Sequence, residues 1–157
     1  MLTKNINFKN FKLKKINNKI KKDLKIILRE NNEILKSLNI GYKNSYNKKT
    51  ISKFKKYSHF RVVGMGGSIL GTESIYDFLK HKIKKNFYFN NNLQSKIKNS
   101  VKKNSVNLII SKSGNTLETI ANSNIIIKKN DKNIFITENQ KSYLNLLAGK
   151  LKAEVVH

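Results

Sequence analysis

From residue 60 onward, short runs of apolar and β-branched residues alternate with stretches in which apolar residues have helical spacing. The runs predict strands at 60–63, 87–89, 106–110 and 134–137. The stretches between and after them predict helices at 68–83, 93–101, 117–127 and 142–151. Strands that alternate with helices of this length are typical of right-handed βαβ crossovers and a parallel sheet covered on both faces. The sequence therefore predicts an α/β fold, organised as a three-layer α/β/α sandwich.

The last residues of the chain continue this alternation. Ala153 to Val156 follow the last predicted helix and have the composition of a strand. They predict the opening of a fifth strand, and hence a mostly parallel five-stranded sheet. A fifth strand that no further element follows leaves one edge of the sheet uncovered. On this ground we expect the chain to be the amino-terminal part of a longer protein, with its α/β domain truncated at the carboxyl end.

The first 58 residues are organised differently. Apolar residues recur every three or four positions between Ile16 and Leu38, which predicts one long amphipathic helix, and Gly41 follows as a stop signal. Residues 39–58 are polar with little periodicity and are expected to form a connection that includes one helical turn. Two parts are therefore predicted, a helical amino-terminal segment with its connection at 1–58 and an α/β domain at 59–157.

The chain is strongly basic, with 33 Lys and Arg against 9 Asp and Glu and a formal charge of +24. Such a charge is typical of proteins that bind polyanions. However, only Arg29 and Arg61 are arginines, and Lys, Asn and Ile are spread along the whole chain. These three are residues of A/T-rich codons, and proline is absent. A biased genome accounts for this composition, so no specific nucleic-acid partner is expected.

Several classes of site are disfavoured by composition. Cysteine is absent, which excludes disulfides, thiolate nucleophiles and Cys-based metal sites. His59, His81 and His157 are far apart in the sequence and lack metal-ligand spacing, so no metal is expected. No apolar run approaches the ~20 residues of a membrane span, and the amino terminus has too much Asn and too little Ser and Arg for a transit peptide. A cytoplasmic protein without a membrane partner is expected.

A glycine-rich joint follows the first predicted strand, with the sequence GMGGSILGTES from Gly64 to Ser74. Glycines let the backbone approach an anion closely, and the N–H groups that begin the next helix point at it. The dinucleotide fingerprint fails because Ile69 stands where its last glycine is required, and the Walker motif fails because Thr72 replaces its lysine. A nicotinamide cofactor and a nucleoside triphosphate are therefore disfavoured, and a small anion is expected.

A second polar joint follows the third predicted strand, in the sequence LIISKSGNTLETIAN. Hydroxyls, a positive charge and a flexible backbone for binding an anion come from Ser111, Lys112, Ser113, Gly114 and Thr116. Asn115 and Glu118 have the spacing of a capping box, which predicts a helix start within a residue or two of Asn115. In an alternative interpretation, the Ser and Thr residues of this joint only cap that helix. Because the carboxyl ends of parallel strands lie at one edge of a sheet, the two joints together favour a phosphorylated small molecule.

The segment GMGGSILG, followed further along by ISKSGNTLET, resembles the sugar isomerase (SIS) domain, and the pair together resembles the glucose-6-phosphate isomerase family. The likeness covers roughly residues 60–157, the first SIS domain of that family. It implies five parallel strands between helical layers and an aldose-ketose isomerase of glycolysis and gluconeogenesis. The implied enzyme interconverts glucose 6-phosphate and fructose 6-phosphate without metal or organic cofactor, and is a homodimer at full length.

The resemblance also implies which residues bind the hexose 6-phosphate: Gly67, Ser68, Ser111, Lys112, Ser113, Gly114, Asn115 and Thr116. In the family, a glutamate moves the proton between C1 and C2, a histidine and a lysine open the ring, and an arginine stabilises the enediolate. These residues are expected beyond His157, so no catalytic residue is expected in this chain, which alone should be inactive. Many family members carry a Thr-containing version of the loop where Gly114 and Asn115 stand. This difference leaves open whether the substrate is a glucose phosphate or a mannose phosphate.

An alternative from another class is a SIS-domain sugar-phosphate sensor in a DNA-binding transcriptional regulator, with residues 1–58 as the reader. Two features argue against it. The predicted helix at 16–38 is a single long one rather than two or three short helices separated by a tight turn, and only two arginines are available for base or phosphate contacts.

Overall fold

The computed structural model describes residues 17–43, 46–93, 104–128, 130–138 and 140–157. Its contacts divide the chain into two compact units, Met1–Asn44 and Ser45–His157. The second unit begins ahead of residue 59 because helix α3 (Lys48–Phe54) belongs to it. Phe54 of α3 and Tyr57 behind it are buried against strand residues of the sheet.

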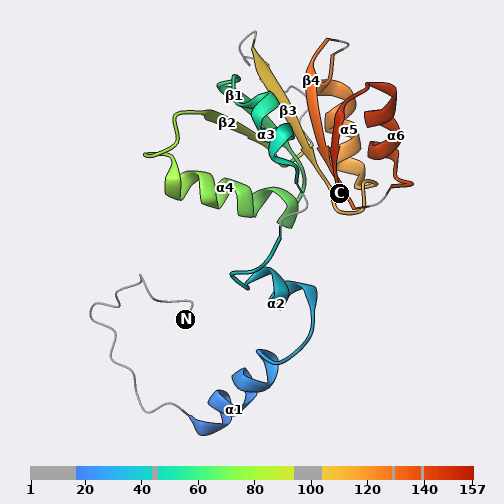
Figure 1. Cartoon of the computed structure of the whole chain (residues 1–157). Coiled ribbons are helices and arrows are strands. Elements are labelled where there is room, and N and C mark those ends of the chain that lie inside the picture. Colours follow the sequence, from blue (N-terminus) through green and yellow to red (C-terminus); the bar gives the residue numbers. More distant parts are fainter. Residues whose placement is uncertain (1–16, 44–45, 94–103, 129, 139) are drawn as a thin grey trace. The chain divides into compact units, whose positions relative to one another are not determined.

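The second unit is built on five parallel strands. They are β1 (His59–Val63), β2 (Asn86–Asn90), β3 (Ser105–Ile110), β4 (Lys132–Ile136) and β5 (Glu154–Val156), in the spatial order β2-β1-β3-β4-β5 (Figure 1). The predicted α/β fold with a five-stranded parallel sheet is confirmed. The order reverses direction between β1 and β3, which makes this pair the switch point of the sheet.

Helices cover both faces of the sheet. Alongside α3, helix α4 (Gly67–Leu79) lies on one face, where Tyr76 contacts the rings of Phe87 and Phe89 on β2. Helices α5 (Leu117–Ile126) and α6 (Tyr143–Lys150) lie on the other face. This arrangement confirms the three-layer sandwich. The helix predicted at 93–101 falls almost entirely outside the described residues.

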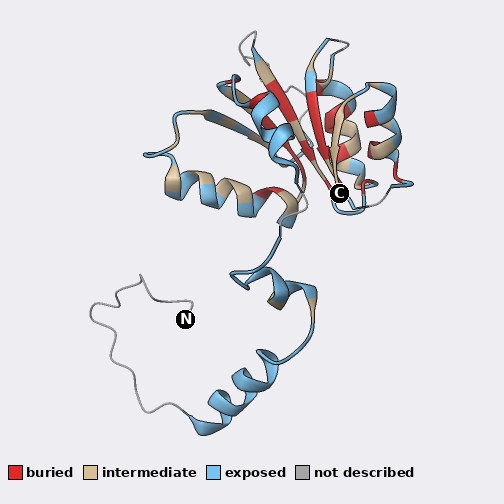
Figure 2. Ribbon diagram, viewed as in Figure 1, coloured by how far each residue is buried: buried red, intermediate tan, exposed pale blue. Residues whose placement is uncertain are grey.

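The core lies along the three central strands, which are buried on both faces (Figure 2). On the α5 and α6 side, Val63, Ile109 and Phe135 are fully buried and pack against the two helices. On the α3 side, Val106 and Ile134 pack against α3 and the residues behind it. Burial on both faces explains why these strands read as continuous apolar runs rather than as alternating ones.

A row of polar side chains interrupts this core near the amino ends of the strands. Arg61, Asn107 and Asn133 occupy paired positions on β1, β3 and β4, and all three are buried. The Asn107 amide donates to Asn133 Oδ1 at 2.9 Å and to Asp131 Oδ2 at 3.1 Å. Burial lowers the pKa of the Arg61 guanidinium, while the charge of Asp131 raises it. Asp131 therefore stabilises a cation inside the domain.

Helix α3 is joined to the edge strand β5 by one carboxylate. Glu154 accepts a hydrogen bond from Thr50 at 3.1 Å, and its other oxygen lies 2.7 Å from the Lys53 ammonium. The hydrogen bonds from Lys53 and Thr50 lower the pKa of Glu154. The carboxylate therefore stabilises the docked helix in its ionised form.

Substitution Glu154→Gln is expected to lower the free energy of unfolding by about 0.5 kcal/mol at neutral pH, the size typical of a partly exposed ion pair. Because folding lowers the pKa of Glu154, its contribution is present above the unfolded pKa and is lost as the pH falls through the folded pKa. In urea unfolding, the difference from wild type should disappear between about pH 5 and pH 3. A difference that persists at pH 3 would contradict this account. Glu33→Gln is the matched control, with no change in the α/β unit, because Glu33 lies in the other unit.

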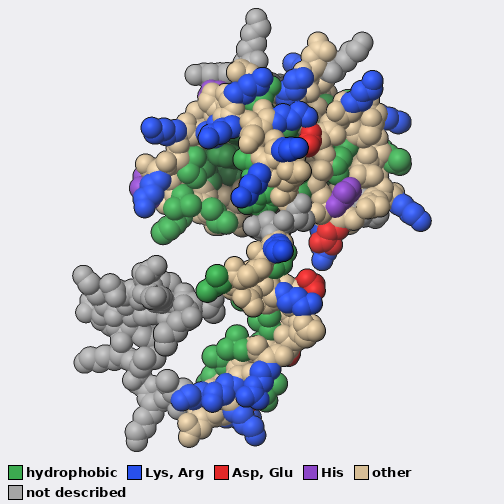
Figure 3. Space-filling model, viewed as in Figure 1, with side chains coloured by type: hydrophobic (Ala, Val, Ile, Leu, Met, Phe, Trp, Pro, Cys, Tyr) green, Lys and Arg blue, Asp and Glu red, His purple; other side chains and the backbone are tan. Residues whose placement is uncertain are grey.

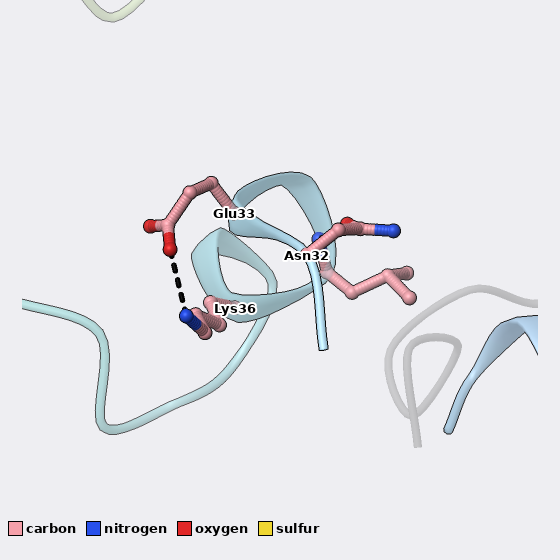
Figure 4. Close-up of polar contacts among 4 residues, drawn as sticks. Asn32, Glu33 and Lys36 are labelled. Atoms are coloured by element: carbon pink, nitrogen blue, oxygen red, sulfur yellow. Dashed lines mark hydrogen bonds and ion pairs between the residues drawn. The ribbon is translucent and has the colours of Figure 1, made fainter. Parts of the chain in front are cut away.

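In the first unit, the single helix predicted over 16–38 is wrong. The structure has two helices, α1 (Asn18–Ile27) and α2 (Glu33–Ser37), separated at residues 28–32. The side chain of Asn32 caps α2 by accepting from the Leu35 N–H at 2.9 Å, and Lys36 pairs with Glu33 at 2.7 Å (Figure 4). An asparagine that satisfies the first N–H groups favours a helix start at its own position. The apolar residues keep their helical spacing across this break. The spacing alone does not show where a helix is capped.

Basic side chains are not confined to one element. Figure 3 shows Lys and Arg spread over the visible face of the α/β unit as well as along the helices of the first unit. This distribution agrees with a compositional origin of the charge. Within the described ranges, no helix is both long and apolar enough to cross a membrane.

Candidate functional site

The two polar joints meet at the carboxyl edge of the sheet, where the neighbouring strands β1 and β3 end. Between them lies a pocket of about 500 Å³. Its lining residues are Ser68, Lys112, Ser113, Thr116 and Glu138. In open parallel sheets this position, beyond the switch point, is the usual ligand site.

The first joint begins helix α4 with glycines. Gly66 is the residue before the helix and has a φ of +54°, which glycine adopts without strain. No side chain caps α4, but the Ser68 N–H donates to the Met65 carbonyl at 3.2 Å and the Ile69 N–H to the Gly66 carbonyl at 3.1 Å. Of the first turn, the Gly67 N–H is therefore the one left for a ligand. Ser68 is partly buried and lines the pocket, whereas its neighbour Gly67 is exposed beside it.

In the second joint, three hydroxyls form a connected group. Ser111 is buried, and its Oγ lies 3.0 Å from Thr116 Oγ1 and accepts from the Gly114 N–H at 3.1 Å. Ser113 Oγ lies 3.5 Å from Thr116 Oγ1 and accepts from the Asn115 N–H at 3.2 Å. The buried hydroxyl of Ser111 thus holds that of Thr116, which in turn contacts that of Ser113.

Gly114 and Asn115 fasten this joint to α6. Gly114 has a φ of +65°, and its carbonyl accepts from the Leu144 N–H at 3.1 Å. Asn115 Oδ1 accepts from the Tyr143 N–H at 2.8 Å. The predicted capping box is therefore wrong: helix α5 begins after Thr116, whose side chain makes no capping bond, and the Asn115 side chain is used by another helix.

Lys112 brings a positive charge to the pocket, and Glu138 brings a negative one. The Lys112 ammonium lies 3.8 Å from Glu138 Oε2, and both side chains are mostly exposed. The Lys112 carbonyl accepts from the Glu138 N–H at 3.2 Å and from Thr137 Oγ1 at 3.3 Å. These bonds hold the end of β4 beside the second joint.

Glu138 was not among the predicted site residues. It lies two residues after the end of β4 at the same carboxyl edge, in a chain with 9 acidic residues. An acid at that position was a usable signal, because the ends of parallel strands share one edge.

The eight predicted binding residues thus take different positions. Four of them line the pocket: Ser68, Lys112, Ser113 and Thr116. Ser111 and Gly114 are buried beneath it, and Gly67 and Asn115 are exposed next to lining residues. Hydroxyls, one lysine and the amino ends of two helices suit an anion such as a phosphate. Among the described residues, no group of three or more His, Cys, Asp or Glu is placed to hold a metal ion.

Curated relatives of the chain share one name. The chain is 36% identical over 100 residues to the glucose-6-phosphate isomerase of Methanocaldococcus jannaschii, which covers 59% of this chain and 25% of that protein. It is 40% identical over 87 residues to the glucose-6-phosphate isomerase of Borrelia garinii, covering 48% of this chain and 16% of that protein. The chain therefore spans a quarter or less of the length of these relatives. No protein-family model matches it.

Solved structures share the fold at lower identity. A candidate phosphosugar isomerase involved in capsule formation, from Bacteroides fragilis, matches 88% of this chain and 72% of its own with a TM-score of 0.56 and 20% identity. A candidate phosphosugar isomerase from Salmonella typhimurium matches 74% of this chain and 37% of its own with a TM-score of 0.54 and 21% identity. The Vibrio vulnificus NanR protein, complexed with ManNAc-6P, matches 69% of this chain and 40% of its own at a TM-score of 0.50 and 14% identity. The chain is thus similar in sequence to glucose-6-phosphate isomerases over about half of its length, and it has the fold of these phosphosugar isomerase candidates.

Proposed function

We propose that this chain binds a hexose 6-phosphate and forms part of an aldose-ketose isomerase that interconverts glucose 6-phosphate and fructose 6-phosphate. The observation that carries the proposal is the convergence of two anion-binding joints on one pocket. Ser68 from the first joint and Lys112, Ser113 and Thr116 from the second line it together. The names of the curated relatives support the choice of sugar.

The phosphate is the part of the ligand that this pocket suits best. Ser113 and Thr116 present hydroxyls, and the first N–H groups of α5 have no acceptor within their own helix. The helix dipole favours negative charge at the same place. Hydrogen bonds to an ionised ligand contribute about 1.5–3 kcal/mol each, so a few of them support specific binding.

The proton transfer needs further groups. Moving a proton between C1 and C2 requires a carboxylate or histidine within hydrogen-bond reach of both carbons, and a donor for the developing oxyanion. Glu138 is the one acid that lines the pocket within the described part of the chain, and Glu118 does not line it. In this proposal the pocket residues bind the substrate without turning it over. Formation of fructose 6-phosphate by the 157-residue chain would contradict that.

The binding proposal is tested by calorimetric titration of the chain with glucose 6-phosphate and with inorganic phosphate. Lys112→Ala is expected to raise the Kd for both ligands about tenfold, because it removes a charge-assisted hydrogen bond. Lys150→Ala is the matched control. It removes an exposed lysine from the last turn of α6, outside the pocket, and should leave both Kd values unchanged. Equal affinities of Lys112→Ala and wild type would contradict the proposed site.

A second candidate function, a sugar-phosphate sensor in a DNA-binding regulator, is favoured by one observation. The amino-terminal region contains two short helices instead of the single long one that argued against it. Of the two arginines, however, Arg61 is buried in β1 and unavailable to DNA. A labelled duplex shifted by the full chain at low salt, with the shift reversed by glucose 6-phosphate, would support this candidate. The absence of any shift at low salt would exclude it.

A further inference from the structure

Glu138 is an anion in the wall of a pocket that otherwise suits an anion. Within the described residues it is the only acid that lines the pocket, and its carboxylate lies 3.8 Å from the Lys112 ammonium of the second joint. Its backbone is held at the pocket because its N–H donates to the Lys112 carbonyl at 3.2 Å. The carboxylate is therefore attached at the wall of the pocket, where a ligand can reach it.

The Glu138 carboxylate repels a phosphate group through its like charge. Two like charges about 6 Å apart in water weaken binding roughly threefold per unit of charge at low salt. The Lys112 ammonium offsets this only in part, because it lies 3.8 Å away and both side chains are largely exposed, at 81% and 68%. Such a loose ion pair leaves the oxygens of Glu138 free to accept hydrogen bonds from a ligand.

The size of the pocket leaves room for more than a phosphate. Its volume of about 500 Å³ is many times the roughly 30 Å³ share of one water molecule. A phosphate held by Ser113, Thr116 and Lys112 fills part of it and leaves space beside Glu138. An ionised carboxylate has only acceptor sites, about four of them, and hydroxyl groups are donors that match these sites.

We propose that Glu138 accepts hydrogen bonds from the hydroxyl groups of the ligand, and thereby selects a polyol phosphate over a phosphate ester without hydroxyls. This inference rests on the proposed function, since it assumes that Lys112, Ser113 and Thr116 hold the phosphate. Selection arises because a polyol phosphate gains bonds that compensate for the charge repulsion, whereas a simple ester meets the repulsion alone.

The test is titration of the chain with two ligands of equal charge, glucose 6-phosphate and ethyl phosphate. Wild type should bind glucose 6-phosphate about tenfold more tightly than ethyl phosphate. Glu138→Ala relieves the repulsion for both ligands, so it should lower the Kd for ethyl phosphate up to threefold and raise the Kd for glucose 6-phosphate only about threefold, which removes the tenfold preference. Glu138→Gln, which keeps one acceptor oxygen, should lie between wild type and Glu138→Ala for glucose 6-phosphate. Both variants should unfold at the wild-type temperature, because the side chain is mostly exposed.

The matched control is Glu118→Gln, which removes a negative charge from the first turn of α5 without altering the pocket lining. It should change both Kd values by the same factor. The inference is overturned if Glu138→Ala also changes both by the same factor, or if wild type binds ethyl phosphate as tightly as glucose 6-phosphate. In those cases the phosphate site itself still stands. If wild type binds neither ligand, the proposed function fails, and this inference fails with it.

Discussion

Substitution Gly114→Ala is expected to lower the free energy of unfolding of the α/β unit by about 3 kcal/mol or more and to abolish phosphate binding. Gly114 has a φ of +65°, where an alanine costs about 1–2 kcal/mol. The added Cβ would also overlap the Ser142 side chain and lie 2.8 Å from Thr137 Oγ1. Overpacking of this kind costs typically about 1–3 kcal/mol. Relief of the overlap would move the joint that carries Ser113 and Thr116.

Urea unfolding and titration with glucose 6-phosphate measure the two effects. The matched control is Gly149→Ala in α6, where an added Cβ meets no atom within 4 Å. Because glycine is a poor helix former, this control should stabilise the domain by about 0.5 kcal/mol and leave binding unchanged. Near-wild-type stability of Gly114→Ala would show that the joint does not depend on the left-handed conformation.

Substitution Asp131→Ala is expected to lower the free energy of unfolding by about 2–4 kcal/mol. The Asp131 carboxylate accepts from the Asn107 amide at 3.1 Å and from the Lys128 N–H at 3.0 Å, and both bonds are lost. In addition, the buried Arg61 loses the negative charge that stabilises it. Chemical unfolding at neutral pH measures the cost.

A double-mutant cycle with Arg61→Met separates these two contributions. In the Arg61→Met background, Asp131→Ala should cost at least about 1 kcal/mol less, because no buried cation remains to be stabilised. Equal costs in the two backgrounds would show that Asp131 acts only through its hydrogen bonds. Asp77→Ala, which breaks the exposed pair with Lys80, is the control and should cost less than about 0.5 kcal/mol.

The strands and most helices of the α/β unit were predictable because their signals are local. Apolar runs at the observed strands and glycine joints after them indicate where each element begins and ends, whatever its neighbours are. Helix caps were less predictable, because an asparagine side chain can accept from a nearby N–H group or from one that is distant in the sequence. Asn32 caps its own helix, whereas Asn115 bonds the N–H of Tyr143, 28 residues away.

By itself, the sequence determined the α/β class of this protein, the parallel sheet and the two joints that could bind an anion. These follow from short-range periodicity and from glycines and hydroxyls at the ends of strands. Only the tertiary structure decided which hydroxyls of the second joint face the pocket and which hold it in place. It also placed Glu138 in the wall, because the pairing of β3 with β4 brings the residues that follow β4 beside Lys112. Contacts between residues so far apart in the chain depend on which strands become neighbours in the sheet, and the pattern of residues within one strand does not show its neighbours.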